Sequence, residues 1–90
     1  TRAREWVMDK ILKAISDPTR REILQLLKNG SKSAGEISNK FTISDAAISK
    51  HLSILKEADL VRTHRQGKYI FYEINLSVVE EIITWFTNFF

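Results

Sequence analysis

Five residues between positions 45 and 53 combine small size, hydrogen-bonding groups and one positive charge: Asp45, Ala46, Ser49, Lys50 and Ser53. Exposed helix faces ordinarily favour long charged side chains, whereas short hydroxyl-bearing and Ala positions allow close approach to base edges and thymine methyl groups. The chemistry that this pattern favours is therefore hydrogen bonding to nucleic-acid bases. A plain solvated face is the alternative that this stretch alone leaves open.

A helix over about residues 45–58 must hold these side chains outward. Its apolar residues recur at steps of three and four, as expected for a face that rests on a core: Ala47, Ile48, Leu52, Leu55 and Ala58. Ser44 is placed to cap this helix. A shorter helix precedes it and opens at Ser33, with Glu36 at capping-box spacing. Residues 33–58 therefore predict a helix-turn-helix.

Residues 61–74 predict a β-hairpin, because apolar and polar residues begin to alternate there. Gly67 supplies the positive φ that a hairpin tip needs, and Arg65 and Lys68 make the tip basic. Basic hairpin tips also occur without function. Directly after a helix-turn-helix, however, such a wing is placed to reach backbone phosphates or the minor groove.

The helices expected over residues 5–15 and 76–90 carry more apolar residues than one packed stripe requires. The second begins after Asn75 and has Ser77 and Glu80 at capping-box spacing. The surplus of apolar residues on these two helices predicts a symmetric dimer interface. The candidate interface residues are Trp6, Val7, Ile11, Val79, Ile82, Trp85, Phe86 and Phe89. The alternative is that these aromatic residues close one small core.

Two cations stand where a helix disfavours them. A helix is expected from Pro18 to about Lys28, with Asp17 as its cap, and Arg20 and Arg21 lie in its first turn. The helix dipole is unfavourable for positive charge at that end. A phosphate contact and an ion pair with an acid elsewhere are the two uses that the sequence leaves open.

Composition limits the classes of protein that fit. Ninety residues predict one domain, 1–90. The excess of basic over acidic residues, 14 against 11, is confined to residues 1–74, because residues 75–90 contain two acids and no Lys or Arg. The absence of Cys excludes disulfides and thiolate ligands. Apolar runs are too short to span a bilayer and no signal-peptide pattern opens the chain, so we expect a soluble cytoplasmic protein.

Taken in chain order, the sequence motifs resemble those of the ArsR/SmtB family of bacterial winged-helix repressors. Their residues are most similar to the metal-independent autorepressor branch of that family. The motifs are AISDPTRREILQLL (14–27), AGEIS (34–38), ISDAAISKHLSILKEADLV (43–61) and RQGKYIFYEIN (65–75). The resemblance implies a mainly α, winged helix-turn-helix fold with five helices and a two-stranded wing. It also implies a homodimer that pairs through the terminal helices and represses transcription at a palindromic operator in double-stranded DNA.

By position, the resemblance assigns base reading to Asp45, Ala46, Ser49 and Lys50. Ser44, His51 and Ser53 would lie beside these readers, while Arg65 and Lys68 would contact phosphate or the minor groove. His51 has a second interpretation, as a helix residue packed beside the core. His64 is expected to be a solvent-facing strand residue and not a ligand.

The departures from the family concern metal binding. Metal-sensing relatives carry a Cys pair where this chain has residues 36–39, or Asp and His ligands on a last helix that here has neither. No tetrahedral site can be assembled from two His on different elements, so we expect no metal, no cofactor and no metal regulation. Asp59 replaces the Gly that usually closes the recognition helix, which is tolerable because Asp can adopt the left-handed conformation.

Two other classes of function explain less of the sequence than a DNA-binding repressor does. A winged-helix protein-interaction module explains the fold but leaves the small polar face and the basic tip without purpose. An enzyme fits least, because no phosphate loop, metal cluster or nucleophile–His–acid set is present. The sequence does not show what releases the repressor from DNA. A protein partner, dilution of the repressor and a small ligand at the dimer interface all remain open.

Overall fold

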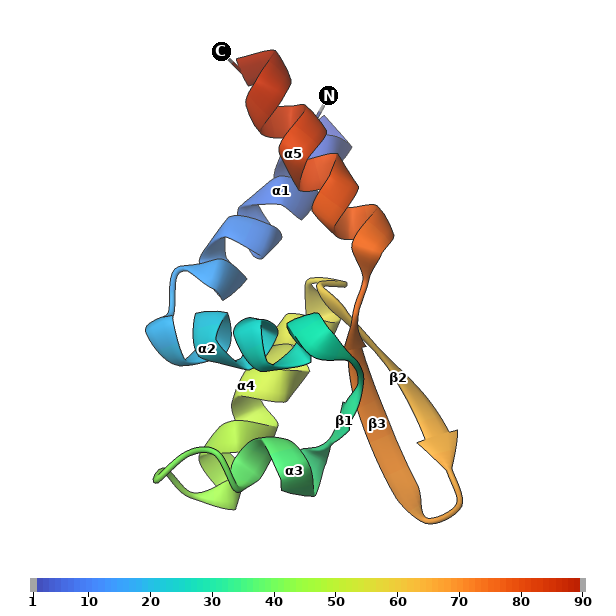
Figure 1. The fold of residues 1–90 in the computed structure, drawn as a ribbon. Helices are drawn as coiled ribbons and strands as arrows, with labels where there is room; N and C mark the ends of the chain where they lie inside the picture. The colour runs from blue at the N-terminus through green and yellow to red at the C-terminus, as the bar shows by residue number, and fades with distance from the viewer. Residues whose placement is uncertain (1, 90) are drawn as a thin grey trace.

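The fold is a winged helix-turn-helix, seen in a computed structural model that describes residues 2–89, with side chains described over residues 6–89. In chain order its elements are α1 (Arg2–Ile15), α2 (Pro18–Leu26), the 3-10 turn η1 (Leu27–Asn29), β1 (Lys32–Ser33), α3 (Ala34–Ser38), α4 (Asp45–Glu57), β2 (Val61–Gln66), β3 (Tyr69–Ile74) and α5 (Leu76–Phe89) (Figure 1). The expected five helices and hairpin are confirmed.

Three of the expected helix starts are confirmed by their caps. The Asp17 carboxylate accepts from the backbone N–H of Arg20, and the Ser44 hydroxyl accepts from that of Ala47. Ser33 and Glu36 form the full capping box, in which the backbone N–H of Ser33 lowers the pKa of the Glu36 carboxyl. These caps satisfy backbone groups that a helix end leaves unpaired. The helices of the helix-turn-helix therefore begin where the sequence predicts.

The capping box expected for Ser77 and Glu80 is wrong. Helix α5 begins at Leu76, so Ser77 already lies inside the first turn and cannot occupy the cap position. The backbone carbonyl of Asn75 accepts from the N–H groups of Val78 and Val79 and starts the helix instead. Correct spacing alone does not make a cap when the cap position, here Asn75, lies two residues earlier.

Every helix before α5 contributes to one core. Its most fully buried residues are Ile11 and Ala14 of α1, Ile23 of α2, Ile37 of α3, and Ile48, Leu52 and Leu55 of α4. Ile11 was expected at the dimer interface, and this expectation is wrong: its side chain is 1 % exposed and has no surface left for a partner. The wide apolar face of α1 thus divides between core and surface.

The hairpin belongs to a sheet of three strands in the order β1-β3-β2. Strands β2 and β3 pair in register from Val61↔Ile74 to Gln66↔Tyr69, and Gly67 turns the chain with φ 63°. Strand β1 was not predicted; it adds Lys32 and Ser33 to the free edge of β3. Asp59 has φ 59°, the left-handed conformation expected of it.

The molecule is elongated, 41 × 25 × 21 Å, and different elements form its two ends. Helices α1 and α5 lie together at the end that holds both termini, while α3, the start of α4 and the hairpin tip lie at the other (Figure 1). None of the helices within residues 2–89 is long and apolar enough to cross a membrane.

Candidate nucleic-acid interface

Helix α4 divides cleanly into a buried and an exposed face. Ile48, Leu52 and Leu55 are 2 %, 1 % and 0 % exposed. Every one of the five small or basic candidates is exposed: Asp45, Ala46, Ser49, Lys50 and Ser53. Because the core holds the helix on three consecutive turns, these side chains project from a rigid element with fixed spacing.

The start of α4 is tied to α3 by a side-chain hydrogen bond. The Ser38 hydroxyl donates to Oδ1 of Asp45, so the acid at the first position of α4 is partly engaged. A carboxylate also suits a helix N-terminus, where it meets the positive end of the dipole. The bond brings Asp45 and Ser38 together at the junction of the two helices, and it leaves the carboxylate exposed on its other side.

A cleft of roughly 200 Å³ lies between α3 and α4. It is lined by Ala34, Gly35, Ser38, Asn39, Asp45, Ile48 and Ser49. Sequence reasoning singled out only Asp45 and Ser49 among these residues as DNA contacts. It missed Asn39, which is exposed and carries an amide that can both donate and accept. The only signal available was its position at the end of α3, directly before the turn.

The hairpin tip presents two cations and two apolar side chains. Arg65 and Lys68 are exposed, as are Tyr69 and Ile70 at 54 % and 46 %. Lys68 Nζ lies 5.4 Å from the centre of the Tyr69 ring, close enough for a cation–π contact. Tyr69 and Ile70 were not singled out from the sequence, because alternation predicted strand residues without indicating which would lie beyond the core.

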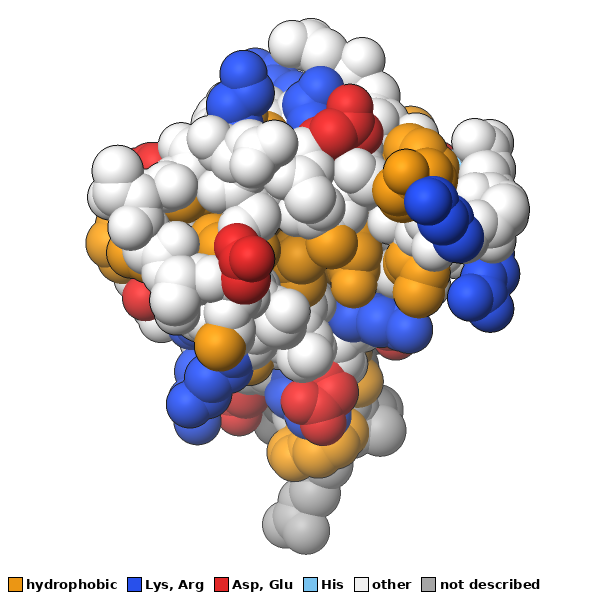
Figure 2. Space-filling model, turned by 90° about the horizontal axis from the view of Figure 1, so that it is seen from below, with side chains coloured by type: hydrophobic (Ala, Val, Ile, Leu, Met, Phe, Trp, Pro, Cys, Tyr) orange, Lys and Arg blue, Asp and Glu red, His pale blue; other side chains and the backbone are white. Residues whose placement is uncertain are grey.

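The start of α4 and the hairpin tip lie at the same end of the molecule (Figure 1). Figure 2 shows this end: Lys and Arg side chains stand mostly toward its margin, and its middle holds mainly uncharged atoms, some apolar side chains and a few acids. In complexes with DNA, cations that contact phosphate position the protein, whereas small polar groups nearer the groove read the bases. The cations at the margin are therefore suited to contact phosphate, and the small polar groups in the middle are suited to contact bases.

His51 lies on the flank of α4 and not on its outermost face. Its Nδ1 atom is 3.1 Å from Nη1 of Arg20 and 3.9 Å from Oδ2 of Asp17, and its side chain is 20 % exposed. The structure therefore places His51 against the start of α2. The backbone N–H of Arg20 and the nearby Arg20 charge hold the pKa of the Asp17 carboxyl below its ordinary value of 3.8.

Arg20 and Arg21 both donate hydrogen bonds to backbone carbonyls. The Arg20 guanidinium donates to the carbonyls of Ala14 and Lys13, and that of Arg21 donates to the carbonyls of Ile15 and Ser16. These carbonyls belong to the end of α1 and the turn after it. Neither Arg forms an ion pair within residues 6–89; both donate instead to carbonyls at the negative end of the neighbouring helix dipole, a use that the sequence did not suggest.

His64 lies on β2 and is half-buried. Its ring stacks on Phe71 of β3 with the centroids 5.6 Å apart and the planes 13° from parallel. It is therefore a packed cross-strand residue and not a freely solvated one. In the part of the chain whose side chains are described, no three His, Asp or Glu side chains come together as a metal site.

The opposite end of the molecule is apolar. Of the dimer candidates, Trp6, Val7, Phe86 and Phe89 are 61 %, 43 %, 39 % and 68 % exposed, whereas Val79, Ile82 and Trp85 are half-buried. Leu76 and Ile83 are 69 % and 60 % exposed and were missed, since the period of α5 does not say which of its two apolar stripes faces the core.

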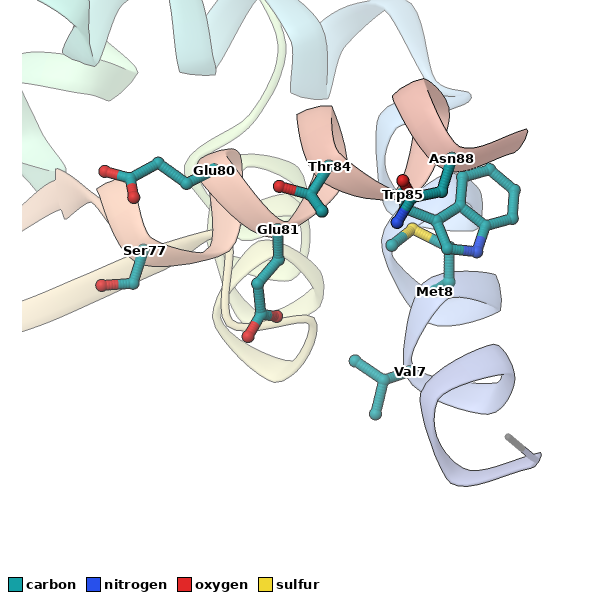
Figure 3. A pocket seen from close by; sticks show the side chains of 8 residues that line it. All are labelled: Val7, Met8, Ser77, Glu80, Glu81, Thr84, Trp85 and Asn88. Carbon is teal, nitrogen blue, oxygen red and sulfur yellow. The ribbon is translucent and has the colours of Figure 1, made fainter. Parts of the chain in front are cut away.

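A cavity of roughly 290 Å³ separates part of α1 from α5. Figure 3 shows Trp85 beside Met8 at this junction, with Glu80 and Glu81 farther along α5. The half-buried Trp85 packs against the core; α1 lines the cavity with Val7 and Met8, and the other lining residues of α5 are polar. Helix α5 therefore rests on α1 at one end and diverges from it at the other.

The sequence is similar to known bacterial regulators. Residues 17–63 match the family described as bacterial regulatory protein, arsR family. The chain is 50 % identical over 82 residues to the transcriptional repressor SdpR of Bacillus subtilis (strain 168). This alignment covers 91 % of each of the two chains.

Solved structures agree with the fold. An ArsR-like transcriptional regulator from Rhodococcus sp. RHA1 superposes with a TM-score of 0.89 at 26 % identity, covering 97 % of this chain and 82 % of that one. A homodimeric winged helix-turn-helix DNA-binding domain from Mycobacterium bovis superposes with a TM-score of 0.80 at 24 % identity, covering 96 % of this chain and 82 % of that one. The second likeness shows the fold alone.

Proposed function

The chain belongs to the ArsR family of bacterial regulatory proteins, and from this premise we propose that it is a transcriptional repressor that binds a palindromic operator in double-stranded DNA as a homodimer. The observation that supports this most is the exposed face of α4. Its small polar residues project from a helix whose other face is fully buried, and the basic wing lies at the same end of the molecule.

The contacts follow from where each side chain lies. Ala46, Ser49 and Lys50 are the proposed base readers, with Asp45 accepting a hydrogen bond from cytosine N4 beside its bond to Ser38. Ser44 and Ser53 flank them, and Arg65 and Lys68 contact phosphate or the minor groove from the wing. His51 supports the helix from its flank, since Arg20 occupies its Nδ1 atom.

The homodimer is proposed on the apolar end of the molecule. Trp6, Val7, Ile83, Phe86 and Phe89 expose large apolar side chains on α1 and α5, and exposed clusters of this kind mark association surfaces. A two-fold axis through this end would carry two copies of α4 to one side of a duplex. Their centres would then enter successive major grooves about 34 Å apart.

We also propose that repression needs no metal ion. The chain has no Cys, and its two His side chains lie on different elements, His51 held by Arg20 and His64 stacked on Phe71. Neither is free to complete a tetrahedral site. Calorimetry with Zn²⁺ on the purified protein tests this: a site with nanomolar affinity would contradict it, and the absence of heat from specific binding is the expected result.

Selection of bound sequences from a random pool of duplexes tests the main proposal. The expected result is enrichment of a palindrome whose half-sites are centred about 10 base pairs apart. Enrichment of a single unrepeated site would contradict the homodimer. No enrichment at all would contradict DNA reading and favour a protein-interaction module.

A further inference from the structure

One arginine joins three helices. Arg20 lies in the first turn of α2, and its Nε and Nη2 atoms donate to the carbonyls of Ala14 and Lys13 at the end of α1, over 2.7 and 3.3 Å. Its Nη1 atom contacts Nδ1 of His51 in the middle of α4, over 3.1 Å. A single rigid guanidinium plane therefore spans α1, α2 and α4.

The contact with His51 has a defined direction. A guanidinium only donates, so Nδ1 of His51 is the acceptor in this contact. The Asp17 carboxylate, 3.9 Å from the same Nδ1 atom, accepts the backbone N–H of Arg20 and balances the positive charge. All of these groups are partly buried, which strengthens the hydrogen bonds relative to a fully exposed site.

The two helices also share the apolar core, but they are not closely packed beside Arg20. A cavity of roughly 270 Å³ lies beside Arg20, between Lys10 and Lys13 of α1 and Ile54 and Glu57 of α4. Where a gap separates two helices, side-chain contacts across it are lost. The hydrogen bonds of Arg20 therefore add a polar connection between the end of α1 and the middle of α4 to the apolar contacts of the core.

Arg21 provides a natural comparison. It donates from Nη1 to the carbonyls of Ile15 and Ser16, over 2.8 and 2.9 Å, and so satisfies the end of α1 as Arg20 does. Over residues 6–89, however, Arg21 forms no hydrogen bond with α4. The two neighbours share charge, helix and type of cap, and they differ in the contact with His51.

We propose that Arg20 is a positioning residue that sets the place of the recognition helix relative to α1. His51 directly follows Lys50 and lies two residues after Ser49, so a shift at His51 moves the proposed base readers. Nearer the start of α1, about 12 Å away along the helix, are the exposed Trp6 and Val7 of the proposed dimer surface. This inference rests on the proposed function: Arg20 would connect subunit pairing to the spacing of the two reading helices.

Distances between two spin labels test the link without DNA. The chain has no Cys, so Asp9→Cys on α1 and Lys56→Cys on α4, both at exposed positions, give unique attachment sites. Labelled protein is diluted into unlabelled protein so that pairs within one protomer dominate. Arg20→Gln should broaden or shift the distance distribution, whereas Arg21→Gln should leave it unchanged. An unchanged distribution in Arg20→Gln would overturn the proposal.

Binding to the selected duplex tests the consequence. Arg20→Gln and Arg21→Gln remove the same charge, yet Arg20→Gln should lose about tenfold in affinity and Arg21→Gln less than about twofold. His51→Leu should match Arg20→Gln, and His51→Asn, which keeps an acceptor near the Nδ1 position, should restore much of the affinity.

Equal losses for Arg20→Gln and Arg21→Gln would overturn the positioning role while leaving the proposed function intact. Wild-type protein that binds all duplexes equally would instead overturn the proposed function. In that case the label distances still decide whether Arg20 holds α4.

Discussion

Helices α4 and α5 have nearly the same length and use their apolar residues in opposite ways. Helix α4 buries Ile48, Leu52 and Leu55 almost completely, and its exposed side is small and polar. Helix α5 has no fully buried residue in the part that the structure describes, and it exposes Ile83 and Phe86. The apolar face of α4 is covered within a single chain, whereas that of α5 is not.

This difference indicates that α4 contributes mainly to folding and α5 mainly to association. Burial of apolar area is the main stabilising contribution to a fold, so α4 stabilises the protomer and keeps its polar face in one place. Exposed apolar area on α5 is stabilised only when something covers it, and a second copy satisfies both protomers at once. Mutations in the two helices should therefore affect different measurements.

The largest effect is expected from the buried face of α4. Leu52→Ala removes a fully buried side chain and should lower the free energy of unfolding by about 2–5 kcal/mol, measured by urea denaturation. Ser53→Ala, one residue on and exposed, is the control and should change it by less than about 0.5 kcal/mol. Similar values for both variants would mean that α4 does not anchor the core.

The exposed face of α5 should instead control association. Ile83→Glu places a carboxylate in the apolar surface and should give a monomer by sedimentation equilibrium. Because two linked half-sites then bind separately, affinity for the palindrome should fall about a hundredfold. Thr84→Glu adds the same charge at the next position, beside the acidic side chains of α5, and should remain dimeric. A dimeric Ile83→Glu would place the interface elsewhere.

The polar face of α4 should affect sequence preference and not folding. Ser49→Ala keeps a small exposed residue but removes the hydroxyl, and should weaken binding to the selected duplex about tenfold. Binding to an unrelated duplex should stay the same, as measured by fluorescence anisotropy. Equal loss on both duplexes would show that Ser49 is not a base reader.

The wing should act through charge alone. Lys68→Ala removes an exposed cation at the hairpin tip and should reduce the slope of log K against log salt by about one unit. Lys28→Ala removes the same charge from η1, outside the proposed interface, and should leave the slope unchanged. A slope that does not respond to Lys68→Ala would remove the wing from phosphate contact.

The smallest effect concerns the cap of α2. Because the pKa of Asp17 is lower in the folded protein than its ordinary 3.8, its ionised form stabilises the fold above that pH, and the contribution is lost as the pH falls through the lowered value. Asp17→Asn should therefore be slightly less stable than wild type at pH 7, with the difference shrinking below pH 3.8. A difference that grows as the pH falls would contradict this assignment.

Local rules predicted much of the fold from the sequence. The caps at Asp17, Ser33 and Ser44 and the left-handed Asp59 depend on a few neighbouring residues, so the sequence contains the information needed to place them. Strand β1 was missed because two residues show no period. The start of α5 at residue 76 is confirmed, but the capping box was wrong because Ser77 has the spacing of a cap and lies two residues after the cap position, Asn75.

The remaining features depend on which segments meet in space. Nothing in the order of residues shows that Arg20 and His51 are in contact, because they are 31 positions apart in the chain. The same holds for the bond between Ser38 and Asp45 and for the assignment of Ile11 to the core. Sequence patterns identify helices and faces, whereas the partners of each face require the tertiary structure.

Competition between two duplexes tests the central claim most directly. The selected palindrome and a scrambled duplex of the same length and composition are compared for wild-type binding at physiological salt. If α4 reads bases from a fixed position, the palindrome should bind at least about a thousandfold more tightly. Equal affinity for the two duplexes would contradict the account.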